Sequence, residues 1–272
     1  MKWERADYDT DPVTLAKKLI GAVLCCRTKE GLTTGRIVEC EAYGGCWRGH
    51  EDDGAHSAKG ITARTKVVFG EPGHAYVYLI YGMYTCLNIV CEPEGIPGCV
   101  LIRAIEPLSG VELMRHRRKG AKGRLLTGGP GRLTMAMGID RSFYGEDLTG
   151  NRLWIEKGEG HFPVKRTKRI GIDYAKYGRN FPWRMVLEDN IYMYLSKEGS
   201  SRETRITSDL AIKPAFPCGC SFVMKEVLAI DVSMHSRLWQ RRLAMHIACF
   251  CLTFQKDPAK RLSNGCESLF VL

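Results

Sequence analysis

The sequence predicts a mixed α/β (α+β) fold: a single domain around a curved antiparallel β-sheet with flanking helices, plus a C-terminal extension. Short segments rich in β-branched and aromatic residues recur through most of the chain, and such segments are typical of strands. They are separated by short connections without the regular intervening helices of a parallel sheet, which predicts antiparallel neighbours. The character of the sequence changes after about Lys197, which places the domain at 1–197 and the extension at 198–272.

The composition is typical of a globular protein that binds an anionic partner. The chain has 272 residues, of which 44% are hydrophobic and 26% charged, as in globular proteins. No apolar run reaches the roughly 18 to 20 residues of a membrane helix, and the N-terminus has no apolar signal core. We therefore expect no membrane association and no secretion, and we expect the 12 cysteines to be free thiols. The net charge of +10 favours an anionic partner, most often nucleic acid.

The first elements can be justified from their end signals. Asp11 can cap a helix that begins at Pro12, and Gly21 can end it. Strands are predicted over 23–26 and 35–43, followed by a long polar, glycine-rich loop over 44–65. Loops of that length in compact domains are usually functional or disordered.

The remaining elements follow from the same patterns. We predict strands over 75–81, 86–91, 98–105, 153–156 and 184–187, and helices over 109–118 and 133–137. The glycine-rich run at 128–131 precedes the second helix, where it could form a plain turn or accommodate a phosphate.

Two of these strands carry a candidate binding slot for a flat ring. On a strand, Glu41 and Tyr43 share one face, and so do Tyr76 and Tyr78 on another strand. A carboxylate beside tyrosine rings forms an acid-lined aromatic slot, in which stacking on a nucleobase contributes roughly 1 to 3 kcal/mol. A positively charged ring would be attracted further by the tyrosine faces.

The segments around this slot resemble one family. The runs RIVECEAY (36–43), PGHAYVYLIYGMYTCLNIV (72–90) and VLIRAIEPLSG (100–110) closely resemble the alkyladenine (3-methyladenine) DNA glycosylase family, and the likeness spans roughly residues 8 to 195. The resemblance implies a base-excision-repair enzyme that flips alkylated purines out of duplex DNA. It also implies hydrolysis of the N-glycosidic bond, which leaves an abasic site, without a metal or organic cofactor.

The resemblance assigns roles to individual residues. Glu41 is implied as the general base that activates water, with Arg103 as its partner in holding that water. The implied substrate-binding residues are Tyr43 and His56 on one face of the extruded base, Tyr78 on the other, and Asn88, which discriminates among purines. The implied DNA contacts are the wedge Tyr81, its neighbours Met83 and Tyr84, and the phosphate-binding residues Arg64, Lys66 and Arg132.

General chemistry supports these roles. A base inside a duplex cannot be reached, so it must be extruded, and an inserted side chain such as Tyr81 restores part of the lost stacking. The N-glycosidic bond breaks through an oxocarbenium-like state, which a carboxylate stabilises while it deprotonates the incoming water. No lysine lies in the three runs beside Glu41, which favours water over an amine as nucleophile and so a monofunctional glycosylase.

Several alternatives stay open at this point. The segment between Glu41 and His56 is longer than the family pattern, so His50 could compete for the place of His56. Arg103 could pair structurally with Glu39 or Glu106. The protein could also be a non-catalytic DNA-lesion binder or a module that binds a free nucleobase. The resemblance implies a monomer that acts on double-stranded DNA containing alkylated or deaminated purines, in the cytoplasm with the nucleoid or in a nucleus.

Overall fold

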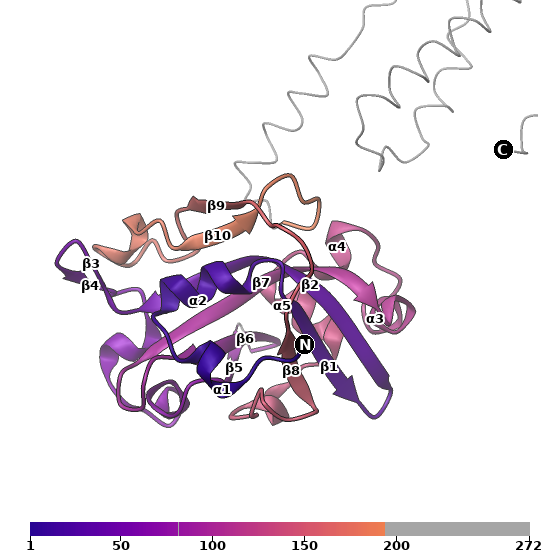
Figure 1. Ribbon diagram of the computed structural model, residues 1–272, viewed down its shortest axis with the longest axis horizontal. Coiled ribbons are helices and arrows are strands. Elements are labelled where there is room, and N and C mark those ends of the chain that lie inside the picture. The colour runs from indigo at the N-terminus through magenta and orange to yellow at the C-terminus, as the bar shows by residue number, and fades with distance from the viewer. Residues whose placement is uncertain (81, 194–272) are drawn as a thin grey trace, which may run out of the picture. The chain divides into compact units, whose positions relative to one another are not determined.

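The computed structural model describes residues 1–80 and 82–193, and it confirms the predicted mixed α/β fold with a large antiparallel sheet (Figure 1). Six strands of the eight-stranded sheet follow the order β5-β6-β7-β2-β1-β8, while β10 pairs with β2 and β9 pairs with β10. All described pairings are antiparallel. The strands of this sheet are β1 (Val23–Thr28), β2 (Gly31–Gly44), β5 (Ala75–Ile80), β6 (Tyr84–Cys91), β7 (Gly98–Ser109), β8 (Leu153–Glu156), β9 (Val164–Thr167) and β10 (Arg184–Leu187).

The helices of the described part are short. They are α1 (Arg5–Tyr8), α2 (Pro12–Leu19), α3 (Val111–Arg117), α4 (Arg124–Thr127) and α5 (Pro130–Met137), together with the 3₁₀ turns η1 (His56–Lys59), η2 (Lys66–Phe69), η3 (Arg141–Phe143) and η4 (Gly178–Asn180). Helix α2 packs on β2 and β7, and α5 packs on β6 and β7. None of the described helices is long and apolar enough to cross a membrane.

Helix α2 forms where its end signals predict. The carboxylate of Asp11 accepts hydrogen bonds from the backbone nitrogens of Val13 and Thr14, which satisfies two of the donors that a helix start leaves unpaired. Leu15 and Leu19 lie on one face and are fully buried. After the helix, Gly21 has a φ of +88°, and a side chain there would collide with the Phe162 ring. Glycine is therefore required where the chain turns into β1.

The long strand β2 is the centre of the sheet. It pairs with β1 through residues 31–36 on one edge and with β10 through residues 39–41 further along, while β7 occupies the other edge. The pairing with β7 is irregular between Ile37 and Cys40. Because neighbours hold both edges around Glu41, the side of the sheet on which that carboxylate points is fixed, since a slip of one residue would turn it to the other face.

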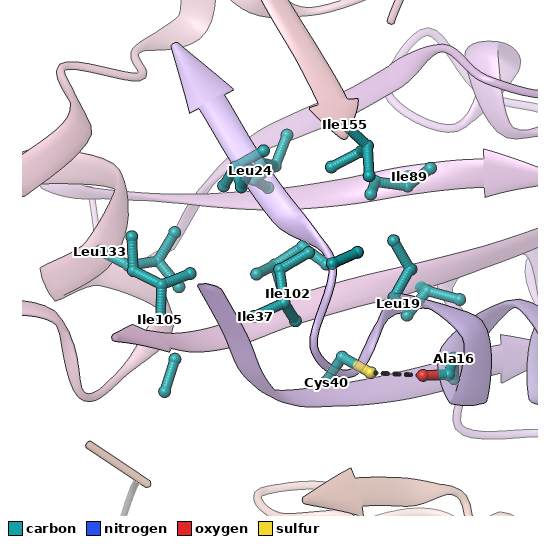
Figure 2. Close-up of a cluster of buried hydrophobic side chains, with 14 of the residues drawn as sticks. Ala16, Leu19, Leu24, Ile37, Cys40, Ile89, Ile102, Ile105, Leu133 and Ile155 are labelled. Atoms are coloured by element: carbon teal, nitrogen blue, oxygen red, sulfur yellow. Dashed lines mark hydrogen bonds between the residues drawn. The ribbon is translucent and has the colours of Figure 1, made fainter. Parts of the chain in front are cut away.

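The main core lies between the sheet and the packed helices. Figure 2 shows part of it, where Leu19, Leu24, Ile37 and Ile102 meet. The Sγ atom of Cys40 donates to the carbonyl oxygen of Ala16 over 3.2 Å, which ties β2 to α2 (Figure 2).

The described part contains seven free cysteines, of which only Cys46 is exposed. Burial raises the pKa of Cys25, Cys26 and Cys99 to about 12. These thiols therefore stay protonated at neutral pH.

The predicted element positions agree with the structure except in a few places. The strand β9 was not predicted, because its sequence VKRT lies at the sheet edge, is largely exposed, and shows no alternation of apolar and polar residues. The predicted loop over 44–65 contains η1 and a small hairpin of β3 (Cys46–Trp47) and β4 (His50–Glu51). The predicted extension at 198–272 lies outside the described residues.

Candidate active site

Two buried carboxylates and two arginines form a charge cluster on β2, β7 and β10. Glu39 and Glu41 are both fully buried. The Nε atom of Arg103 donates to Glu39 over 2.8 Å, and its Nη1 atom donates to Glu41 over 3.2 Å. Arg184 donates to the same oxygen of Glu39 over 2.8 Å. Two positive charges therefore balance two negative charges, as buried ions require.

Glu41 is held by donors on both of its oxygens. Its Oε2 atom accepts from the hydroxyl of Tyr43 over 2.8 Å and from Arg103, while its Oε1 atom accepts from the backbone nitrogen of Ile170 over 2.8 Å. A carboxylate offers about four acceptor positions, so these three described donors fix its orientation and leave capacity for one more, such as water.

The pKa shifts in this cluster have clear causes. Burial alone would lower the pKa of Arg103, but the carboxylates of Glu41 and Glu39 outweigh it and raise that pKa above its usual value. Burial, together with the charge of Glu41, raises the pKa of Tyr43 well above its usual value. Arg103 therefore stays charged, and Tyr43 stays protonated as a donor to Glu41.

An aromatic wall stands beside this cluster on β5 and η1. The ring centroids of Tyr76 and Tyr78 are 5.2 Å apart. The ring of His56 meets Tyr78 edge to face, with centroids 4.9 Å apart, and its Nδ1 atom lies 3.1 Å from the hydroxyl oxygen of Tyr76. The guanidinium of Arg64 lies over the ring of Tyr78, 4.5 Å from its centroid.

The sheet places the carboxylate and the aromatic wall on one face. Tyr76 pairs with Asn88, Asn88 pairs with Leu101, and Leu101 pairs with Glu41, so these side chains form one row across four strands. Directly paired residues of antiparallel strands point to the same face. With strands about 4.8 Å apart, Asn88 and Glu41 lie roughly 10 Å apart across β7. The amide nitrogen of Asn88 donates to the carbonyl oxygen of Tyr76 over 3.0 Å, and the side chain is buried.

A buried ion pair fixes the loop that carries His56. Arg169 donates to both carboxylate oxygens of Asp52 over 2.6 Å, and both side chains are fully buried. Arg169 also donates to the carbonyl oxygen of Ala42, and its guanidinium lies 4.5 Å from the ring centroid of Tyr43. The next residue, Ile170, is a donor to Glu41. Arg169 thus joins the loop, the tyrosine and the carboxylate.

The loop after β2 places His56, and not His50, beside the tyrosine wall. His50 lies on β4 and stacks on Tyr177, with ring centroids 4.0 Å apart and planes 6° from parallel. Asp53, next to the buried Asp52, accepts hydrogen bonds from the backbone nitrogens of residues 176–178. The loop thus contains the hairpin β3–β4, and its end is anchored by Asp53.

The residues expected to contact DNA are more scattered. Met83 is 67% exposed and Tyr84 is 39% exposed at the turn between β5 and β6, while Tyr81 lies outside the described residues. Lys66 is exposed on η2, and Arg132 on α5 donates to the carbonyl oxygen of Gly128 over 3.0 Å. Arg64, expected at a phosphate, is exposed, and its guanidinium lies over the ring of Tyr78.

Sequence reasoning missed part of this site. The strand period places Glu39 on the face of Glu41, but it indicated no role for Glu39 beyond a possible pairing with Arg103. In the structure Arg103 bridges Glu39 and Glu41, and Glu106 pairs with Arg36. Arg169 and Ile170 gave no local signal, since their partners lie more than 100 residues away in the chain.

Comparisons with known proteins identify the family of the chain. The methylpurine-DNA glycosylase (MPG) family matches residues 6–191. The chain belongs to this family. A protein of Alkaliphilus oremlandii named "Putative 3-methyladenine DNA glycosylase" is 45% identical over 203 residues, which cover 71% of this chain and 98% of that protein. A protein of the same name from Clostridium acetobutylicum is 44% identical over 200 residues, covering 70% of this chain and 96% of the relative. The family match ends before the extension at 198–272.

The environment of His56 gives a prediction about pH. Burial, with the nearby charges of Arg64 and Lys59, lowers the pKa of His56 to about 4, and the tyrosines that contact it stay neutral. The unfolded chain, with an ordinary histidine pKa near 6.5, then binds more protons between pH 4 and 6.5, so this histidine stabilises the fold less as the pH falls. We expect His56→Asn to reduce the loss of thermal stability between pH 6.5 and pH 4.5.

The measurement is the melting temperature of both proteins at several pH values. His161, which lies on an exposed loop, provides the matched control as His161→Asn. An unchanged difference between pH 6.5 and pH 4.5 in His56→Asn would show that His56 titrates normally.

Proposed function

We propose that the protein flips alkylated purines out of duplex DNA and hydrolyses their N-glycosidic bond, leaving an abasic site. The observation that supports this most directly is the buried carboxylate of Glu41, oriented by Tyr43, Arg103 and Ile170 on the same face of the sheet as the aromatic wall. A fixed carboxylate beside a site for a planar ring suits attack of water on the sugar that carries the ring.

In the proposed reaction, the bond between the purine nitrogen and the sugar breaks as positive charge develops on the sugar. The carboxylate of Glu41 stabilises this charge and accepts a proton from the attacking water. Arg103 neither donates nor accepts that proton, since its raised pKa keeps it charged; it holds the Glu41 oxygen in place. The electron pair of the broken bond stays with the base, and alkylation makes the base a better leaving group.

The aromatic wall supports selection of damaged bases. Tyr78 and His56 offer ring surfaces, and a cationic alkylated base is attracted to a tyrosine face more than a neutral one. Extrusion costs a few kcal/mol and is easiest for damaged pairs. We place Tyr81, with Met83 and Tyr84, at the space that the flipped nucleotide leaves. The enzyme acts as a monomer on double-stranded DNA. It is located with that DNA, in the cytoplasm beside the nucleoid or in a nucleus.

The test uses duplexes that each carry one 3-methyladenine, 7-methylguanine, hypoxanthine or 1,N6-ethenoadenine. We expect strand breaks at the lesion after incubation and alkaline treatment, and intact strands without alkali, since water is the proposed nucleophile. Breaks before alkali would contradict a monofunctional enzyme. Salt-dependent binding without any abasic product would favour a lesion-binding protein instead.

A further inference from the structure

The guanidinium of Arg64 occupies the tyrosine face at which a base would stack. It lies 4.5 Å from the ring centroid of Tyr78, and its Nη2 atom is 3.4 Å from Nε2 of His56. The backbone carbonyl of Arg64 accepts a hydrogen bond from the hydroxyl of Tyr144 over 3.2 Å. The side chain is therefore directed into the wall from an anchored position on the loop after η1.

The spacing of His56 and Tyr78 leaves no room for a third ring between them. Stacked or tilted aromatic pairs have centroids about 4.5 to 7 Å apart, so two rings that hold a third between them stand roughly twice as far apart. The centroids of His56 and Tyr78 are 4.9 Å apart, at an interplanar angle of 78°. A base can enter between them only if His56 and Arg64 move.

The chemistry of Arg64 matches that of the ligand. A guanidinium is planar, delocalised and always charged, and it stacks on aromatic faces. An alkylated purine is likewise planar, with its positive charge spread over the ring. The lowered pKa of His56 keeps its ring neutral, so that it can accept a hydrogen bond from the guanidinium.

We propose that Arg64 is a displaceable occupant of the base-binding slot, which holds the stacking face of Tyr78 until an extruded base replaces it. This inference rests on the function proposed above. When a site is open for only a fraction of the time, the apparent affinity of its ligand falls by that fraction. Arg64 therefore opposes base entry in the DNA complex, which is the opposite of what a phosphate contact to the flipped nucleotide would do.

The experiment measures base extrusion inside a saturated complex. A duplex containing 1,N6-ethenoadenine reports unstacking by its fluorescence, and Glu41→Gln prevents the base from being lost. We compare E41Q with E41Q/R64Q at protein concentrations that bind all of the DNA. We expect the extrusion equilibrium constant to rise about two- to fivefold in the double variant, the size of effect that an exposed cation–π contact produces.

A matched control removes a different charge from the same loop. Lys59 is exposed at the end of η1, and E41Q/K59Q loses one positive charge as E41Q/R64Q does. We expect its extrusion constant to match that of E41Q. As an independent measure of the contact, the pKa of His56 followed by NMR should rise from about 4 in R64Q, because the charge of Arg64 contributes to lowering it.

Each result for the extrusion constant of E41Q/R64Q either supports or overturns the proposed role of Arg64. A lower extrusion constant in E41Q/R64Q would show that Arg64 binds the flipped nucleotide, and an unchanged constant would show that it does not occupy the slot; either result overturns the proposal. The wild-type protein is assayed for excision on the four lesion duplexes named above. If it excises none of these bases, the proposed function fails, whereas excision together with an unchanged extrusion constant removes only the role of Arg64.

Discussion

Replacing Glu41 by glutamine is expected to lower the single-turnover rate of base excision by roughly 10²- to 10⁴-fold, the range that a general base contributes. Glutamine has nearly the same shape, and its oxygen can still accept from the backbone nitrogen of Ile170. It cannot accept a proton from water, and its amide nitrogen faces Arg103 with a donor where a charged acceptor stood. Alkali-labile sites formed in a single turnover measure the loss.

Two comparisons make this result specific. Binding to a duplex with an abasic site should persist in E41Q, and its melting temperature shows whether the fold is intact. Glu106→Gln is the matched control, because that carboxylate lies on β7 in a partly exposed pair with Arg36. We expect it to excise within about twofold of the wild-type rate. Full activity of E41Q would remove Glu41 from the reaction.

The second large effect is a loss of folding stability when the buried pair of Asp52 and Arg169 is broken. We expect Asp52→Asn to lower the free energy of unfolding by about 3 to 5 kcal/mol, the cost of leaving one member of a buried ion pair without its partner. Arg169 would keep its charge at a fully buried position, while one of its two carboxylate contacts would become an amide. Unfolding in urea, followed by tryptophan fluorescence, measures the change.

A partly exposed pair in the same domain is the control. Arg5 and Asp147 lie 2.7 Å apart, with side chains 34% and 43% exposed. Asp147→Asn should cost no more than about 1 kcal/mol, because water screens such pairs. Equal losses in the two variants would mean that burial adds nothing to the pair of Asp52 and Arg169. Reduced excision by Asp52→Asn at temperatures where it stays folded would reveal the link through Ile170 to Glu41.

Local patterns were sufficient to predict most of the sheet. Strands such as β5 and β7 are long runs of β-branched, aromatic and aliphatic residues, so their own composition identifies them. The two-residue period of β2 was sufficient to place Glu41 and Tyr43 on one face, where the structure joins them by a hydrogen bond of 2.8 Å. The exposed strand β9 lacks an alternation of apolar and polar residues. It forms because its backbone pairs with the edge of β10.

The parts of the site that depend on distant pairings could not be predicted. Asp52 and Arg169 are 117 residues apart, and nothing near either one specifies the other. The place of Arg64 depends on the path of the loop from η1 to η2, which the glycine-rich sequence leaves open. The resemblance to a family implied roles for individual residues, but it did not indicate that the guanidinium of Arg64 lies over the ring of Tyr78.

The buried thiols of the domain have a consequence for an enzyme of this family. Reagents that methylate purines also react with sulfur, and they do so through the deprotonated form. In the described residues, burial raises the pKa of Cys25, Cys26 and Cys99 to about 12, so almost none of this reactive form is present at neutral pH. Of the seven described cysteines, only Cys46 on the small hairpin is exposed. Among the described residues, the buried thiols are therefore poor targets for the methylating reagents that damage purines.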